Sequence, residues 1–150
     1  MWNWEFYGEL TAPWFDNIEA HNATTTLTLS RCWSTTPDNN ASGLFDWNID
    51  GVGSTPSSST GPTGAYSGNN YFYTEASSGS TGSIATLESP FVDLTSLTNP
   101  QLEFYYHMYG ATMGNLYVLI SNDGGSTFTA IDSIIGQQQT TQNDTHMIRV

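Results

Sequence analysis

The residues of this chain that are able to do chemistry are mainly carboxylates. Its 150 residues include fourteen acidic side chains, with Arg31 and Arg149 as the only Lys or Arg, which gives a formal net charge of −12. This balance argues against nucleic acid and anionic membranes as partners, because binding to phosphates depends on Lys and Arg. Carboxylates in this number suit a divalent cation. An acidic surface adapted to a salty or extracellular setting explains the same composition equally well.

No arrangement typical of catalysis accompanies these acids. His21, His107 and His146 are scattered and lack the spacing of a metal-binding His-x-x-x-His motif. There is no Gly-x-Ser-x-Gly elbow, and no pair of acids stands out as the pair of a glycosidase. Cys32 is the single cysteine, so it has no partner for an internal disulfide, and we interpret it as a small buried hydrophobe. We therefore expect no enzymatic activity.

Short strands are the elements that must position the acids. The stretch from Gln101 to Gly110 contains four aromatic residues and has side chains to bury on both faces, so it predicts a central strand. In the stretch from Leu44 to Asp50, alternation places Phe45, Trp47 and Ile49 on one apolar face and leaves an oxygen-rich polar face opposite. No segment shows helical periodicity with caps. Short strands with turns between them predict an all-β sandwich.

Further strands are expected on both sides of residues 51–70, which we interpret as a long surface loop within one domain rather than a linker. These strands are Asn22 to Arg31, Tyr71 to Ala76, Ile84 to Ser89, Phe91 to Leu94, Leu116 to Ile120, Phe128 to Ile135 and His146 to Val150.

An ordered series of five motifs covers roughly residues 16–139. The motifs are Phe45-Asp46-Trp47, Ser59-Thr60-Gly61-Pro62, Tyr71-Phe72-Tyr73-Thr74-Glu75-Ala76-Ser77, Ala85-Thr86-Leu87-Glu88-Ser89-Pro90, and Phe104-Tyr105-Tyr106-His107-Met108-Tyr109-Gly110 with Met113-Gly114-Asn115-Leu116. Together they resemble the MAM domain, in the bacterial form found in large secreted proteins. The resemblance implies a jelly-roll-like antiparallel β-sandwich that serves as an extracellular adhesion or interaction module without catalysis of its own.

The chain departs from animal MAM domains, which carry two disulfides. Cys32, beside Trp33, resembles one of those cysteines without its partner, so packing must supply the stability. The closing strands of the family would lie beyond Val150. We expect residues 1–14 to be a lead-in or upstream segment, and residues 15–150 to be a sandwich that is truncated at its C-terminal end and lacks its last strands.

The resemblance also implies a calcium site. Asp16 and Glu19 stand where related domains carry acidic residues near their start, and Asp46 lies in the Phe-Asp-Trp motif. We predict that these three residues are ligands of a structural calcium ion, with Asp50 as a weaker addition. Calcium takes about six to eight oxygen ligands, several of them carboxylates. In so acidic a chain, solvated surface is the competing explanation for any one of these side chains.

One further motif is a turn. The segment from Ser121 to Phe128 resembles the Asp-box of sialidase propellers, Ser-x-Asp-x-Gly-x-Thr followed by an aromatic residue. Asp suits the turn because its carboxylate binds nearby backbone N–H groups, and Gly because it tolerates positive φ. A propeller repeats such a motif blade by blade, and one copy here predicts only a structural turn between two strands.

The partner and the location follow from what the chain lacks and what it resembles. No apolar run approaches the ~20 residues of a membrane span, and the first residues do not form a signal peptide. We expect a domain of a longer secreted or cell-surface protein, with a protein or glycan partner and other domains of the same chain around it. The alternative is a carbohydrate-binding jelly roll appended to a secreted enzyme. Its support is a set of four aromatics able to stack on sugars, Trp2, Trp4, Trp14 and Tyr66. Packing in the core or between domains also explains the three tryptophans.

Overall fold

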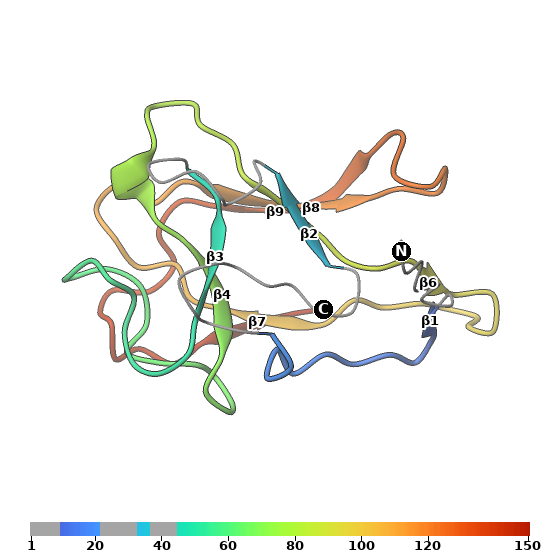
Figure 1. The fold of residues 1–150 in the computed structure, drawn as a ribbon, viewed down its shortest axis with the longest axis horizontal. Coiled ribbons are helices and arrows are strands. Elements are labelled where there is room, and N and C mark those ends of the chain that lie inside the picture. The colour runs from blue at the N-terminus through green and yellow to red at the C-terminus, as the bar shows by residue number, and fades with distance from the viewer. Residues whose placement is uncertain (1–9, 22–32, 37–44) are drawn as a thin grey trace, which may run out of the picture. The chain divides into compact units, whose positions relative to one another are not determined.

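The computed structural model of the chain describes residues 10–21, 33–36 and 45–150 (Figure 1). These residues form short strands and one 3-10 turn, η1 (Ala76–Ser78), and contain no α-helix, which confirms the all-β prediction. Among them there is no apolar helix of membrane-spanning length. The strands are β1 (Leu10–Thr11), β2 (Ser34–Thr36), β3 (Trp47–Asp50), β4 (Tyr71–Thr74), β5 (Thr86–Glu88), β6 (Val92–Asp93), β7 (Phe104–Tyr106), β8 (Asn115–Ile120), β9 (Thr129–Ile135) and β10 (Met147–Arg149).

The described strands pair two by two. β1 and β6 are parallel, whereas β2–β5, β3–β4, β7–β10 and β8–β9 are antiparallel. The chain divides into two compact units. The first comprises Met1–Gly53 and Ala65–Gln101, and the second comprises Ser54–Gly64 and Leu102–Val150. The predicted loop of residues 51–70 is therefore shared between the two units.

In the first unit, β3 and β4 form an antiparallel pair whose register runs from Trp47 opposite Thr74 to Asp50 opposite Tyr71. The predicted apolar face of β3 is confirmed at Ile49, which is buried, and at Trp47, whose indole Nε1 donates to the carbonyl oxygen of Ala85 at 3.1 Å. The polar side of this segment also turns inward, because Asp46 is buried as well.

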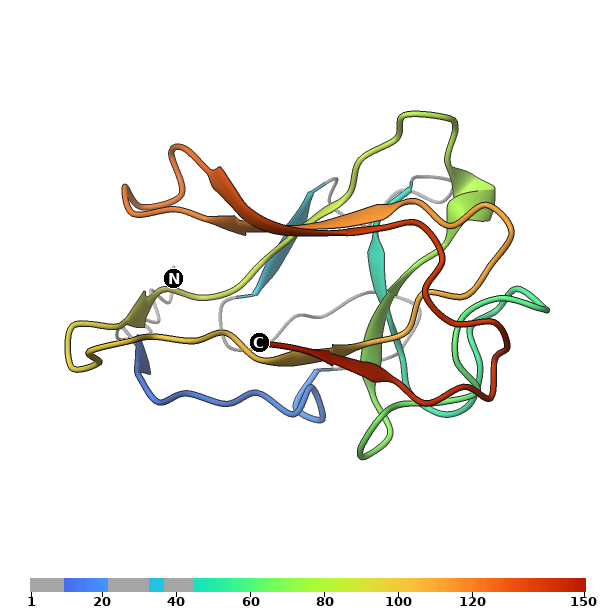
Figure 2. The ribbon, with the colours of Figure 1, turned by 180° about the vertical axis from the view of Figure 1, so that it is seen from behind.

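In the second unit, β10 lies beside β7, with Met147 opposite Tyr106 and Arg149 opposite Phe104 (Figure 2). The Arg149 guanidinium forms an ion pair with Asp132 of β9. Met108, Ile134 and Pro62 are buried apolar side chains of this unit. A turn joins β8 to β9, and its Asp123 carboxylate accepts hydrogen bonds from the Ser126 and Thr127 backbone N–H groups at 3.1 and 2.9 Å, which confirms the predicted turn between two strands.

The long central strand predicted from Gln101 to Gly110 is wrong in extent. Regular pairing is confined to β7, and among the described residues β10 is its only ladder partner. Beyond β7 the backbone N–H of Met108 donates to the Gln139 side chain at 2.7 Å instead of to a neighbouring strand. Leu102 and Tyr105 are exposed, so each of the two faces is buried only in part. Alternation in the sequence shows which side chains share a face but does not show which backbone groups find a partner strand.

Candidate functional site

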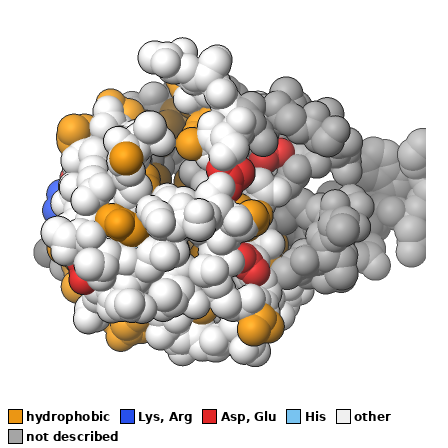
Figure 3. Space-filling view, turned by 90° about the vertical axis from the view of Figure 1, so that its left-hand side faces the viewer, with side chains coloured by type: hydrophobic (Ala, Val, Ile, Leu, Met, Phe, Trp, Pro, Cys, Tyr) orange, Lys and Arg blue, Asp and Glu red, His pale blue; other side chains and the backbone are white. Residues whose placement is uncertain are grey.

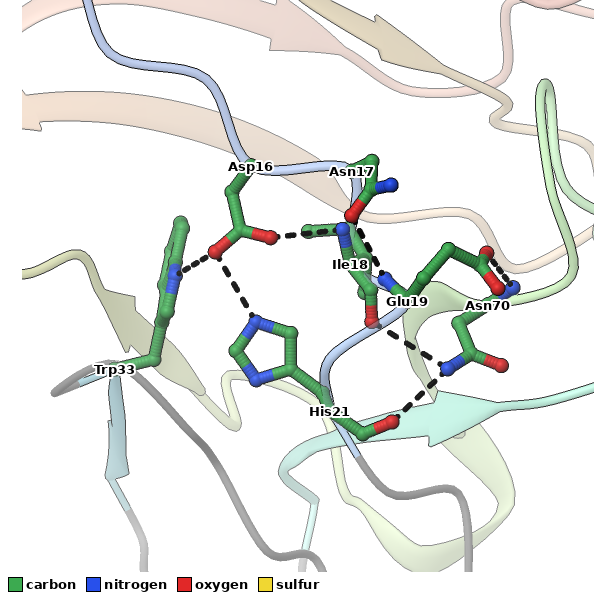
Figure 4. A network of polar contacts seen from close by, with 7 residues as sticks. All are labelled: Asp16, Asn17, Ile18, Glu19, His21, Trp33 and Asn70. Atoms are coloured by element: carbon green, nitrogen blue, oxygen red, sulfur yellow. Dashed lines mark hydrogen bonds and ion pairs between the residues drawn. The ribbon is translucent and has the colours of Figure 1, made fainter.

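Two of the predicted ligands lie in one turn of the first unit, residues 16–21, shown in Figure 4. The Asp16 carboxylate is the centre of this turn. Its Oδ1 accepts a hydrogen bond from the Ile18 backbone N–H at 2.8 Å. Its Oδ2 accepts from the indole Nε1 of Trp33 at 3.1 Å and lies 3.3 Å from Nε2 of His21. We call Asp16, His21 and Trp33 the Asp16 cluster.

The Asp16 cluster is buried among aromatic rings. The side chains of His21 and Asp16 are 0% and 3% exposed. The Phe72 ring centroid lies 5.3 Å from that of Trp33 and 5.4 Å from that of His21. Burial acts to raise the pKa of Asp16, but the hydrogen bonds from Ile18 and Trp33 and the attraction of His21 outweigh it, so the pKa is lowered. Asp16 is thus a buried carboxylate kept ionised by its donors.

The backbone of this turn is strained at Ile18. Its φ of 65° is in the left-handed region, where β-branched residues are rare because of steric conflict. Besides the bond from its N–H to Asp16, the Ile18 carbonyl oxygen accepts from the His21 N–H at 3.1 Å and from Asn70 Nδ2 at 3.4 Å. The surrounding hydrogen bonds therefore hold a conformation that the residue by itself disfavours.

Glu19 joins the turn to the loop that precedes β4. Its Oε1 accepts from the backbone N–H groups of Asn69 and Asn70, at 2.7 and 2.8 Å. These bonds lower the pKa of Glu19, which is exposed. Asn70 strengthens the same junction, because its Nδ2 also donates to the carbonyl oxygen of His21 at 2.9 Å. Glu19 and Asn70 together fix the turn against the loop.

A glycine next to Glu19 allows a direct test of this junction. A Cβ atom at Gly68 (φ +72°) would lie 2.3 Å from Oε1 of Glu19 and force the carboxylate away from its two N–H donors, whereas a Cβ atom at Gly124 (φ +77°) meets nothing within 4 Å. Both alanines carry the same left-handed backbone cost. We expect Gly68→Ala to lower Tm more than Gly124→Ala at pH 7 in thermal unfolding.

The excess effect of Gly68→Ala depends on pH. Since the pKa of Glu19 is lowered in the folded state, its stabilisation is present above the ordinary value of 4.5 and is lost as pH falls below it. The difference between the two variants should therefore shrink at pH 3. Equal Tm changes at pH 7 would show that Glu19 does not hold the loop.

The third predicted ligand, Asp46, precedes β3 and is 3% exposed. Its Oδ1 accepts from Nδ2 of Asn48 at 2.8 Å. Burial raises the pKa of Asp46, and the hydrogen bond from Asn48 opposes that rise only in part. The weaker candidate, Asp50, accepts from the Tyr71 hydroxyl at 3.3 Å. Burial and the Asp50 charge raise the pKa of Tyr71, which remains a neutral donor.

The described acidic side chains do not by themselves supply the ligands that calcium requires. In the described part of the chain, no three His, Cys, Asp or Glu side chains gather so as to hold a metal ion. Asp16 and Glu19 share a turn, but their oxygens already accept N–H groups, and these residues alone fall short of the six to eight oxygens, roughly, that calcium takes. The three-ligand calcium site stays a prediction. Cys32 and the strand predicted from Asn22 to Arg31 lie outside the described residues.

Sequence reasoning missed the partners of the two carboxylates. Trp33 lies 17 residues from Asp16 in the chain, and Asn70 lies 51 residues from Glu19. No spacing rule connects residues so far apart. A local signal that could have found part of the site is Asp16 itself, because an Asp side chain often accepts a hydrogen bond from the backbone N–H two residues later, here that of Ile18.

The fold and the site together define an all-β protein whose buried polar groups hold loops in place. The chain belongs to the MAM domain family, described as MAM domain, meprin/A5/mu, whose model matches residues 32–148. No solved structure matches the chain. MAM domains are jelly-roll β-sandwiches, and they are typically non-catalytic adhesion modules of extracellular proteins that mediate protein interactions as parts of longer chains.

Proposed function

We propose that this MAM domain is a non-catalytic module of a larger secreted or cell-surface protein and that it binds a protein partner. The observation that supports this most directly is the family match over residues 32–148 of an all-β chain. The chemistry of the site agrees with the proposal. Asp16 and Glu19 accept hydrogen bonds that fix the turn and the adjoining loop, and this explains their presence without a substrate.

The surface that we propose for the partner is the β8–β9 face, which we define as the exposed side chains of four apolar residues on these strands. They are Tyr117, Leu119, Ile131 and Ile135, with exposed fractions of 55%, 44%, 58% and 59%. Tyr117 lies opposite Ser133, and Asn115 lies opposite Ile135, so the neighbours on this face are uncharged. Ile131 is the extra residue where the register shifts, between Asp132 opposite Val118 and Ala130 opposite Leu119.

An apolar and uncharged surface on so acidic a chain is suited to a protein interface. Exposed apolar groups of this kind mark interaction sites, and the centres of protein interfaces are depleted in charge. On the face drawn in Figure 3, by contrast, hydrophobic side chains lie in small separate groups, with backbone, other side chains and a few carboxylates between them.

The charge of the chain indicates which kind of protein would bind. With a formal net charge of −12, two copies of this chain repel each other. A different protein, with basic residues around an apolar patch, would be attracted to the acidic surface and would bury its patch on the β8–β9 face. Attraction of this kind accelerates encounter and weakens as salt screens it.

The carbohydrate-binding alternative has less support from the described aromatics. Trp14 packs on Trp33, with ring centroids 6.1 Å apart, so it is not an open platform for a sugar ring. Tyr66 is exposed. Trp2 and Trp4 lie outside the described residues. The alternative nevertheless defines the second arm of the experiment.

The experiment is to apply the labelled chain to an array of purified extracellular proteins from its source organism and, in parallel, to a glycan array. We expect saturable binding to a protein that weakens as the salt concentration rises, because the acidic surface steers the encounter. Binding to glycans alone would favour the carbohydrate-binding alternative. Binding to neither array would contradict the proposed role.

A structural calcium ion at Asp16 and Glu19, with Asp46 as the third ligand, is a separate proposal. Its support is the acidic composition and the shared turn of the first two residues. If the ion binds, millimolar calcium should raise Tm above the value in EDTA, because a ligand at a hundredfold excess over its Kd stabilises the folded state by about 2.7 kcal/mol. Glu19→Gln should remove this shift, and magnesium serves as the control ion. A Tm that is the same in calcium and in EDTA would contradict the proposed calcium site.

A further inference from the structure

Two histidines of the second unit lie together just beyond the end of the β7–β10 ladder. His107 follows Tyr106 and His146 precedes Met147, the two residues that pair at that end. Their ring centroids are 5.3 Å apart, with an interplanar angle of 57°. Both ring nitrogens of His107 are buried and make no hydrogen bond of ordinary geometry, and the Thr141 backbone is the polar group that acts on the ring most directly. A buried imidazole without such a hydrogen bond is costly when neutral and far more costly when charged.

Hydrogen bonds next to the two histidines attach the loop of residues 137–146 to the end of β7. The Gln139 side chain, which is 2% exposed, accepts from the Met108 N–H at 2.7 Å and donates to the Tyr106 carbonyl oxygen at 3.3 Å. The Gln138 N–H donates to the Met108 carbonyl oxygen at 2.8 Å. We call these three hydrogen bonds the Met108–Gln139 clasp. It joins the chain just after His107 to the loop that leads to His146.

We propose that His107 and His146 form an acid-sensitive latch, in which protonation at mildly acidic pH opens the Met108–Gln139 clasp and releases the loop of residues 137–146 from β7. The closed state requires two neutral rings side by side. Opening exposes the buried nitrogens of His107 to water, where the ring takes up a proton freely. The module would then differ in shape between neutral surroundings and an acidic compartment.

The charges around the pair do not offset this effect. Asp144 is the acidic side chain that faces His107, and its carboxylate already accepts from the Thr140 and Thr141 N–H groups at 2.6 and 3.0 Å. Arg149, farther along β10, is paired with Asp132. Burial and the charge of His146 lower the pKa of His107, although the Thr141 backbone and Asp144 act in the opposite direction. Burial likewise lowers the pKa of His146.

The direction of the pH dependence follows from these shifts. In the open state both rings return to the ordinary value of 6.5, whereas in the closed state they bind protons only at lower pH. The closed state is therefore fully stable above pH 6.5 and loses stability as pH falls from 6.5 through the lowered values. Each proton taken up on opening changes the equilibrium by about tenfold per pH unit.

The experiment is amide hydrogen exchange on the full chain between pH 7.5 and 5.5, corrected for the intrinsic exchange rate. The chain has three histidines, and an unperturbed carboxylate titrates at about pH 4, below the range of the experiment. We expect the protection of the Met108 and Gln138 amides to fall below pH 6.5 by about tenfold per pH unit if one ring takes up a proton on opening, and by up to about a hundredfold if both do. Amides of the β8–β9 ladder should change less. Protection that stays constant at Met108 and Gln138 would overturn the latch.

Variants assign the effect to the pair. Replacing both residues with Phe (His107→Phe with His146→Phe) or both with Gln (His107→Gln with His146→Gln) leaves His21 as the only histidine, and either change should abolish the pH dependence. The same dependence in a folded double variant would assign it to His21 and overturn the proposal. Should neither variant fold, ring-proton NMR titration of the natural chain decides. Values below 6.5 for His107 and His146 support the latch, and values at or above 6.5 overturn it.

Discussion

Replacing Asp16 with alanine should lower the free energy of unfolding by about 2 to 4 kcal/mol, because hydrogen bonds to a charged group and the desolvation of abandoned donors are of this size. The Asp16 side chain is 3% exposed and accepts from Ile18 and Trp33, with His21 beside it. Without the carboxylate, the Trp33 indole N–H and the buried His21 ring lose their contact with its Oδ2, and the strained Ile18 loses the bond to its N–H. Urea unfolding of the full chain at pH 7 measures the change.

Two further variants show whether burial makes the difference. Asp16→Asn has the same shape but directs an N–H₂ group toward one of the donors, so we expect it to be destabilised as well. Asp93 is the matched control, because it also accepts from the backbone N–H two residues on, that of Thr95 at 2.8 Å, but is solvated. Asp93→Ala should have a clearly smaller effect, and equal effects at the two positions would contradict the buried network.

The Asp16 effect also has a predicted pH dependence. Because the pKa of Asp16 is lowered in the folded state, its contribution is present above the ordinary value of 3.8 and is lost as pH falls through the lowered value. The gap between the natural chain and Asp16→Asn should therefore narrow in acid. A gap that stays constant down to pH 2 would mean that the charge of Asp16 does not contribute.

Replacing Gln139 with alanine should cost about 2 to 4 kcal/mol, since it leaves buried polar groups unpaired and opens a cavity. Gln139 Oε1 accepts from the Met108 N–H, and its Nε2 donates to the carbonyl oxygens of Tyr106 and Thr145 at 3.3 and 3.5 Å. One side chain thus joins β7 to the loop before β10. The neighbouring Gln138 is the control, because its Nε2 donates to the carbonyl oxygens of Ile135 and Gly136, which are local in the chain, and Gln138→Ala should have a small effect.

An isosteric change at Gln139 sharpens this prediction. Gln139→Glu keeps the acceptor for Met108 but turns the donor into a carboxylate oxygen that faces two carbonyl oxygens. Burial and these carbonyls should raise the pKa of the new side chain, so Gln139→Glu should be strongly destabilised at pH 7 and partly recover near pH 5 as it becomes protonated. Urea unfolding at both pH values measures this. A Gln139→Glu variant as stable as the natural chain at pH 7 would contradict the role of the donor.

The sequence predicts the parts of this fold that depend on neighbouring residues. Alternation in the stretch from Leu116 to Ile120 and in that from Phe128 to Ile135 corresponds to β8 and β9, because half-buried strands expose every second side chain. The placement of Asp16 and Glu19 in one turn was also accessible, since they are three residues apart. Their chemical role was not, because it depends on which distant groups reach them.

The sequence does not show which polar groups far apart in the chain form hydrogen bonds with each other. Alternation places Asp46 on the oxygen-rich face of its segment but does not show that its side chain is buried. Gln139 gave no warning in the sequence, although it replaces a missing strand partner for Met108. In both cases a polar side chain satisfies groups that only the folded chain brings together. Polar side chains that do this inside a domain look like surface residues in a sequence pattern.

The proposed function requires that the domain binds a protein partner through the β8–β9 face. Its most direct test is the Kd of the array-selected protein partner for the natural chain and for a double variant, Tyr117→Ser with Ile131→Ser. Both residues are exposed, so Tm should not change. The control double variant, Ile84→Ser with Phe91→Ser, alters exposed apolar residues of the first unit. We expect the β8–β9 variant to bind the partner at least about tenfold more weakly than the natural chain does, and the control variant to bind it as the natural chain does. Unchanged affinity in the β8–β9 variant would contradict the proposal.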